Sequence, residues 1–76
     1  MPHVIVKMAA GRSEQDKKRL AERVALAVMN TLGTSQEAIS VAIEDVLPDD
    51  WNTQVYDPDI AGRQDTIYKQ PGYERF

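Results

Sequence analysis

A long amphipathic stretch in the first half of the chain constrains the fold more than any other feature. From Glu14 to Leu32 the apolar residues recur at helical spacing, with one stripe formed by Leu20, Val24, Val28 and Leu32. This spacing is typical of an α-helix with one apolar face. Ser13 is a favoured N-cap residue, and Gly33 stands where a helix favours glycine after its last turn. The pattern therefore predicts a single helix about 28 Å long.

Two short stretches rich in β-branched residues lie on either side of this helix. Residues 2–8 and 38–46 each alternate in the way that strands do. On the first strand one face holds Pro2, Val4, Val6 and Met8. A strand, a long crossover helix and a second strand form a β-α-β unit with parallel strands. The expected fold class is therefore α/β (α+β), in a single domain over residues 1–76.

The pattern weakens after the second strand. Residues 47–51 are typical of a turn that opens a short helix. Asp57 and Pro58 have the form of an N-cap followed by proline at the first helical position. We therefore expect a second short helix over residues 58–69, weakened by Gly62 and followed by a tail.

The composition excludes several classes of function. Nine Lys and Arg residues against twelve Asp and Glu residues give a net charge of −3, which argues against a nucleic-acid-binding domain. The chain has no Cys and one His, His3, so no disulfide, thiolate nucleophile or metal site is predicted. No glycine-rich phosphate-binding motif follows the first strand, and no cofactor is predicted. No signal peptide or membrane-spanning run is present, so we expect a cytoplasmic protein without membrane contacts.

The length of the chain points to self-association. A domain of 76 residues buries only about 60% of its unfolded surface. Small proteins compensate with disulfides, metals or oligomerisation, and the first two are not expected here. We expect a homo-oligomer whose sheet is completed by a second copy, most simply a dimer.

Pro2 is the residue with the most distinctive chemistry. A small second residue permits removal of the initiator Met, and the chain then starts with a secondary amine. Apolar neighbours on the same strand face lower the pKa of such an amine, which suits it to act as a base. The structural alternative is that proline is simply well tolerated at the start of a strand.

Several of these features together resemble the 4-oxalocrotonate tautomerase family. The resemblance rests on Pro2, Gly11-Arg12-Ser13, the long helix, the strand Ile-Ser-Val-Ala-Ile-Glu-Asp and Trp51. The ending Lys-Gln-Pro-Gly-Tyr is similar to that of a slightly longer subgroup of probable tautomerases. The resemblance covers at least residues 2 to 51.

The resemblance implies a cofactor-independent isomerase that assembles into dimers or hexamers. Pro2 takes the position of the general base that moves a proton in an enol or 2-keto acid. Arg12 takes the position of an arginine that binds the substrate carboxylate and draws charge during the reaction. Trp51 takes the position of an aromatic residue that walls the pocket. The other interpretations are that Arg12 is a solvated loop residue and that Trp51 fixes the second helix to the sheet.

The chain departs from the family at one position. Ser40 stands where the family has a second arginine on the second strand. A monoacid such as an aryl enolpyruvate is therefore favoured over a dicarboxylate as substrate, and Arg63 and Arg75 are the candidates to replace the missing group. The alternatives to a tautomerase are a non-catalytic oligomeric binding protein, or a hydratase or dehalogenase of the same superfamily.

Overall fold

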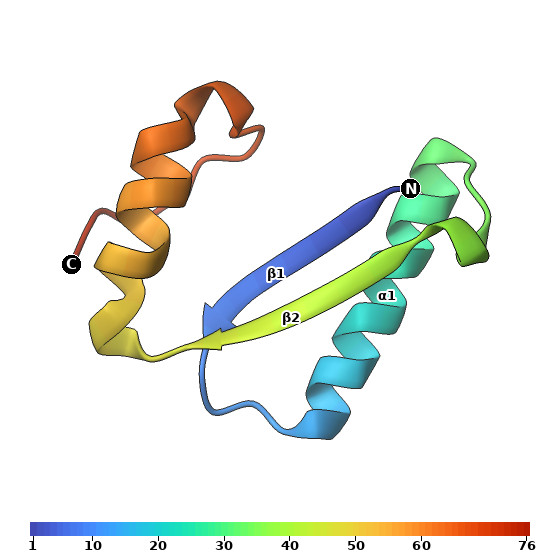
Figure 1. Cartoon of the computed structure of the whole chain (residues 1–76), viewed down its shortest axis with the longest axis horizontal. Helices are drawn as coiled ribbons and strands as arrows, with labels where there is room; N and C mark the ends of the chain where they lie inside the picture. Colours follow the sequence, from blue (N-terminus) through green and yellow to red (C-terminus); the bar gives the residue numbers. More distant parts are fainter.

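The computed structural model describes all 76 residues and has the expected β-α-β unit at its centre (Figure 1). Strand β1 runs from His3 to Ala9, helix α1 from Glu14 to Leu32, and strand β2 from Ser40 to Val46. The two strands are parallel, and their register pairs His3 with Ser40 and Ala9 with Val46. The predicted fold class, with a helical C-terminal segment and a sheet left open, is confirmed.

Helix α1 begins and ends where its sequence predicts. The Ser13 hydroxyl accepts a hydrogen bond of 3.1 Å from the backbone N–H of Asp16. Gly33 adopts a φ of 73°, a left-handed conformation that favours glycine, and donates its N–H to Met29 O at 2.8 Å. Both ends of the helix thus have partners for backbone groups that the helix itself leaves free.

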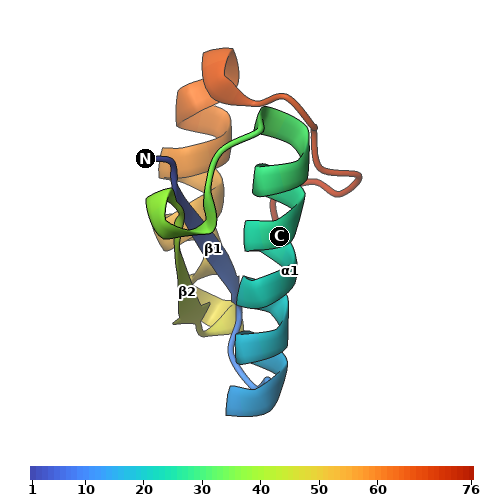
Figure 2. The same ribbon diagram turned by 90° about the vertical axis from the view of Figure 1, so that its right-hand side faces the viewer.

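One face of the sheet is covered by α1 (Figure 2). Lys17 of the helix forms an ion pair of 2.5 Å with Asp45, which identifies this face on β2. The register puts Met8 beside Asp45, and so Pro2, Val4, Val6 and Met8 belong to the covered face. On the opposite face His3 and Ile5 are exposed, whereas Lys7 is half-buried and paired with Asp59 of the C-terminal segment.

The single chain has almost no buried core. Only Val46 and Val55 are buried, at 6% and 5% exposure, while Ile5 is 51% and Leu47 is 63% exposed. Most apolar side chains of the strands and of α1 are half-buried. A chain with so little burial leaves much apolar surface for another molecule to cover.

The C-terminal segment is helical over a different range from the one predicted. A short 3₁₀ turn over Pro48–Asp50 leads into a π-helix over Asn52–Ile60, and a 3₁₀ helix follows over Ala61–Thr66. The predicted helix over 58–69 is therefore wrong in its bounds. Residues 47–51 do open a helix, as expected.

Two residues explain that error. Asp57 and Pro58 lie inside the helical segment, and Asp57 therefore does not cap its start. Proline lacks the N–H of a helical residue and crowds the preceding turn, and the chain is wound in the wider π form where it occurs. A Cβ at Gly62 would lie 2.9 Å from the backbone oxygen of Asp57, so glycine permits a close approach here.

The bounds of both strands also differ slightly from the prediction. Strand β2 starts at Ser40, two residues later than expected, because Gln36–Ala38 form a 3₁₀ turn. Strand β1 starts at His3 and ends at Ala9, each one residue later than expected. No helix in the structure combines the length and the apolar character needed to cross a membrane.

Candidate active site

Pro2 lies at the start of β1. Its carbonyl oxygen accepts a hydrogen bond of 3.2 Å from the backbone N–H of Ser40, which holds it against the start of β2. Pro2 is partly buried, as are Val4 and Val6, whereas His3 and Ile5 are exposed. The structure thus gives Pro2 the apolar strand face that its sequence predicts.

Arg12 lies beyond the opposite end of β1, in a hollow of about 480 Å³. The lining residues come from the end of the strand, the following loop and the first half of α1: Met8, Ala9, Arg12, Asp16, Arg19, Leu20 and Arg23. Arg19 approaches Asp16 at 3.8 Å, while Arg12 and Arg23 form no ion pair. This arginine hollow has a net positive charge and two guanidinium groups free to bind an anion.

Trp51 lies in a second hollow, of about 270 Å³, at the same end of the sheet. Its lining residues are almost entirely apolar: Ala9, Pro48, Trp51, Tyr73 and Phe76. The indole Nε1 of Trp51 donates a hydrogen bond of 3.0 Å to the hydroxyl of Tyr73. We call this the aromatic hollow. Its shape and chemistry suit an apolar ring.

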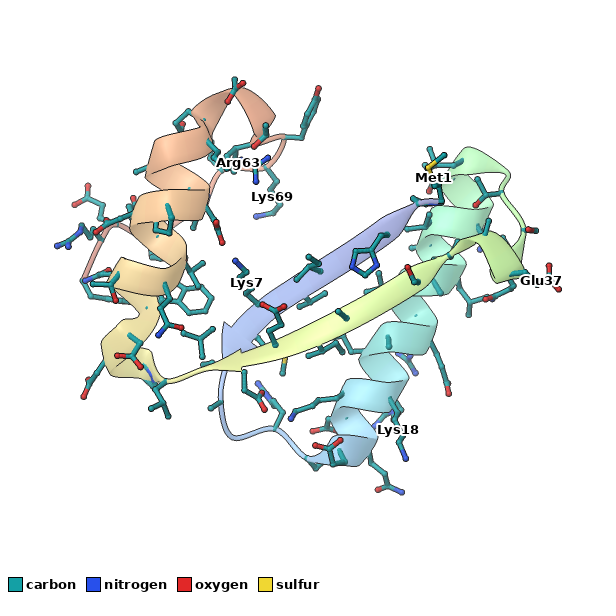
Figure 3. The ribbon with its side chains drawn as sticks, viewed as in Figure 1. Met1, Lys7, Lys18, Glu37, Arg63 and Lys69 are labelled. Carbon is teal, nitrogen blue, oxygen red and sulfur yellow. The ribbon has the colours of Figure 1, made fainter.

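The structure places Arg12 and Trp51 at the same end of β1 and leaves Pro2 apart. Ala9, the last residue of β1, lines both hollows, so the cationic and the apolar surface have this residue in common. From Pro2 to Ala9 the strand advances about 23 Å. Figure 3 shows Met1 at the start of β1, at the opposite end of the strand from its arrowhead. Pro2 therefore does not reach the two hollows of its own chain.

The two candidates for the missing second arginine have different surroundings. Arg75 makes two hydrogen bonds to the Asp57 carboxylate, of 2.8 and 3.0 Å, and is already occupied. This contact with Arg75 lowers the pKa of Asp57. Arg63 forms no ion pair, and it lies with Lys69 beneath the last helical turn (Figure 3). Neither arginine lines either hollow.

Other polar residues near the sheet are paired with each other. Ser40 forms a hydrogen bond of 2.6 Å between its hydroxyl and His3 Nδ1 on the exposed face. Lys7 forms an ion pair of 2.5 Å with Asp59, and this hydrogen bond raises the pKa of the Lys7 ammonium, against the opposing charge of Arg63. No three His, Asp or Glu side chains gather as metal ligands would.

Tyr73 and Phe76 line the aromatic hollow, although the sequence pattern does not predict it. Both belong to the tail and are far from Trp51 along the chain, and no periodic pattern connects them. The available signals are that aromatic residues are few, 7% of the chain, that two of them stand in its last four positions, and that Tyr73 ends the Lys-Gln-Pro-Gly-Tyr stretch.

Comparison with known families gives consistent results. Residues 2–56 match the model of a family described as "Tautomerase enzyme". A "Probable tautomerase" from Xylella fastidiosa is 51% identical over 73 residues, which cover 96% of this chain and 89% of that protein. "Tautomerase PptA" from Pectobacterium carotovorum is 42% identical over 74 residues, which cover 96% of this chain and 97% of that protein.

Solved structures show the same similarity over about two thirds of the chain. The crystal structure of TomN, a 4-oxalocrotonate tautomerase homologue in the tomaymycin biosynthetic pathway, superposes with a TM-score of 0.64 at 38% identity. The match covers 66% of this chain and 77% of that one. YwhB, another 4-oxalocrotonate tautomerase homologue, gives a TM-score of 0.61 at 46% identity over 63% of this chain and 79% of that one.

Proposed function

Because this chain belongs to the tautomerase family and is an isomerase, we propose that Pro2 is the general base with which it moves a proton in an enol acid. Proteins of this family act on small molecules and are typically oligomeric. Membership of an enzyme family also sets aside the alternative of a non-catalytic binding protein. Pro2 is a base only after removal of Met1, since the nitrogen of a peptide-bonded proline is an amide.

The proposed reaction is the ketonisation of an enol acid. The Pro2 nitrogen accepts the proton of the enol hydroxyl, which leaves an enolate. As the enolate oxygen forms the carbonyl at carbon 2, the electron pair of the carbon–carbon double bond takes this proton from the Pro2 ammonium at carbon 3. No atom is gained or lost overall. A free amine on an apolar strand face suits this role because poor solvation of the ammonium lowers its pKa towards neutrality.

The two hollows support an aryl enolpyruvate as the substrate. We assign the substrate carboxylate to the arginine hollow, where Arg12 is free to bind it with two hydrogen bonds. The same guanidinium draws negative charge as the enolate forms. We assign the aryl ring to the aromatic hollow beside Trp51. The two binding surfaces adjoin at Ala9, which leaves the enol carbon between them.

A second copy of the chain supplies the base in this proposal. Two sheets related by a two-fold axis and paired in antiparallel directions would bring the start of one β1 to the end of the other. Pro2 of one copy would then stand near Ala9 of its neighbour, between the two hollows. The separation of Pro2 from Arg12 within one chain is the single observation that carries this arrangement.

A pH–rate profile of phenylenolpyruvate ketonisation tests the role of Pro2. We expect activity to fall on acidification, because a protonated Pro2 cannot accept the enol proton. Pro2→Ala keeps an amine at the terminus but changes its basicity and position, and we expect a loss of about 10²–10⁴-fold in kcat. Intact mass confirms in each preparation that Met1 is gone. Undiminished activity of Pro2→Ala would remove Pro2 from the mechanism.

A further inference from the structure

We propose that the tail, residues 73–76, forms the wall that binds the substrate's aryl ring and makes the enzyme prefer aryl over aliphatic enol acids. The proposal rests on the function proposed above and adds its substrate specificity. The tail lies beyond residue 56, where the match to the family model ends, so the general family pattern does not assign it a role.

The tail brings two aromatic rings to the aromatic hollow. Tyr73 and Phe76 stack with their ring centroids 5.6 Å apart and their planes 9° from parallel. Tyr56 of the π-helix approaches Tyr73 at 5.9 Å with a tilt of 56°. Trp51 completes the surface through its hydrogen bond to the Tyr73 hydroxyl. Offset and tilted contacts of this kind are the favoured geometries for aromatic rings.

Polar bonds hold these rings in place. The side-chain amide of Asn52 donates to Phe76 O at 2.8 Å and accepts from Phe76 N at 3.2 Å, in the manner of a neighbouring strand. Arg75 binds the two carboxylate oxygens of Asp57 at 2.8 and 3.0 Å. We call these contacts the tail clasp. The clasp thus holds the backbone N–H and C=O of Phe76 and the side chain of Arg75.

The clasp holds the rings without burying them. Phe76 is 78% and Tyr73 is 39% exposed, although burial is what normally stabilises an aromatic ring. Fixing a short tail costs conformational entropy, which four polar contacts offset while the apolar rings stay open to solvent. This arrangement is expected of a surface that becomes covered when a ligand binds.

The chemistry of the aromatic hollow explains why an aryl acid would be preferred over an aliphatic diacid. Its lining offers no charged group, and the one indole N–H is already bound to Tyr73. A second carboxylate of an aliphatic diacid would lose its hydration there without gaining a partner. An aryl ring loses little hydration and gains contacts with Trp51, Tyr73 and Phe76.

The first experiment compares two substrates on tail variants of the full-length oligomer. We expect Phe76→Ala to lower kcat/KM for phenylenolpyruvate about tenfold or more, and to lower kcat/KM for 2-hydroxymuconate much less or not at all, so that the preference for the aryl substrate falls. Phe76→Leu keeps an apolar wall and should restore most of the activity. Tyr68→Ala is the matched control, because Tyr68 is an aromatic residue of the same segment that is 99% exposed and lines neither hollow.

The second experiment tests the clasp as a positioning element. Arg75→Asp should raise KM for phenylenolpyruvate and leave kcat unchanged, because the catalytic groups are not touched. The exchange Asp57→Arg with Arg75→Asp restores the opposite charges and should recover the KM. Asn52→Ala should act in the same direction as Arg75→Asp. A purely structural role would lower kcat for both substrates alike.

Binding without turnover separates this proposal from the proposed function. Trp51 is the only tryptophan, so its fluorescence reports on the aromatic hollow. Hydrocinnamate, an unreactive aryl acid, should change this fluorescence in the parent protein and bind at least about tenfold more weakly to Phe76→Ala. An inactive enzyme with this tail-dependent binding would contradict the proposed function and support the aryl site.

Two results would overturn the aryl site in an active enzyme. One is an equal loss of kcat/KM for both substrates in Phe76→Ala, or no loss for either. The other is a tail variant that dissociates the oligomer in sedimentation while its binding of hydrocinnamate is unchanged, since the tail would then serve as a contact between copies.

Discussion

Different interactions stabilise the β-α-β unit and the C-terminal segment. In the first, backbone hydrogen bonds join β1 to β2 in register, and caps at Ser13 and Gly33 close α1. In the second, contacts join residues that are distant along the chain. The side chain of Asn52, for example, forms hydrogen bonds with the backbone of Phe76. Both parts share one deficit, because each exposes apolar residues that a folded single chain would normally bury.

This difference separates a scaffold from a binding surface. The β-α-β unit sets the distance between Pro2 and Arg12, which is fixed by the length of β1. The C-terminal segment brings Trp51, Tyr73 and Phe76 to the end of that strand. The Lys7–Asp59 ion pair is a direct side-chain link between the two parts. We infer that the scaffold positions the reaction and the segment selects the substrate.

The largest expected effect is that of dilution, because we expect both parts to need a second copy of the chain for stability. With Val46 and Val55 as the only buried residues, the single chain lacks the apolar burial that a stable domain needs. We expect sedimentation at low micromolar concentration to show a dimer or larger species, and dilution to cause unfolding. A folded monomer at that concentration would contradict this expectation.

The next effect concerns the two buried valines, one in each part. Val46→Ala and Val55→Ala should each lower the free energy of unfolding by about 1.5–2 kcal/mol, because each removes two buried carbon atoms. Urea denaturation at a fixed protein concentration measures the change. Tyr68→Ala serves as the control and should stay within about 0.5 kcal/mol. Equal effects in all three variants would show that burial does not distinguish these sites.

A smaller effect compares the helix cap with the tail clasp. Ser13→Ala removes the acceptor for Asp16 N and should lower the free energy of unfolding by about 1 kcal/mol. Asn52→Ala should change the free energy of unfolding by less than about 0.5 kcal/mol, since it loosens only the tail. Urea titrations of both variants in parallel decide the point. A larger loss in Asn52→Ala would mean that the tail supports the whole fold.

The smallest effect is the pH dependence of the ion pairs. The pKa of Asp57 is lowered by Arg75, so this pair stabilises the fold above the usual pKa of aspartate and is lost as pH falls through the lowered value. The pKa of Lys7 is raised by Asp59, so the stabilisation that this shift reports is lost as pH rises through the raised value. We expect both ion pairs to stay formed from about pH 5 to pH 9, and Trp51 fluorescence of the protein that retains Met1 to stay nearly constant over this range. A transition of the clasp within that range would contradict this assignment.

The two parts also differ in how far the sequence predicts them. Local rules placed α1 to the residue, because Ser13, Gly33 and the stripe from Leu20 to Leu32 act within the helix itself. The same rules misjudged Pro58, which favours a helix start locally but lies inside a π-helix in the structure. Contacts such as Arg75 with Asp57 join residues 18 positions apart, and no periodic signal reports them.

The residues of the candidate site also differ in how far the sequence predicts them. Pro2, Arg12 and Trp51 are predicted from their order along the chain and from a family resemblance, and the structure places the last two in two hollows that share Ala9. Tyr73 and Phe76 were not found, because their part in the aromatic hollow depends on how the tail folds back. The identity of a replacement for the arginine missing at Ser40 also depends on that folding.

The central claim is that each active site combines Pro2 of one copy with Arg12 and Trp51 of another. The direct measurement mixes two inactive proteins, one with Pro2 blocked by a retained Met1 and one carrying Arg12→Ala. They are unfolded and refolded together, and mass spectrometry confirms that mixed oligomers form. One site in each mixed dimer then has both groups intact, so phenylenolpyruvate ketonisation should return to a substantial fraction of the parent activity. Confirmed mixed dimers without any activity would show that Pro2 and Arg12 do not meet across copies.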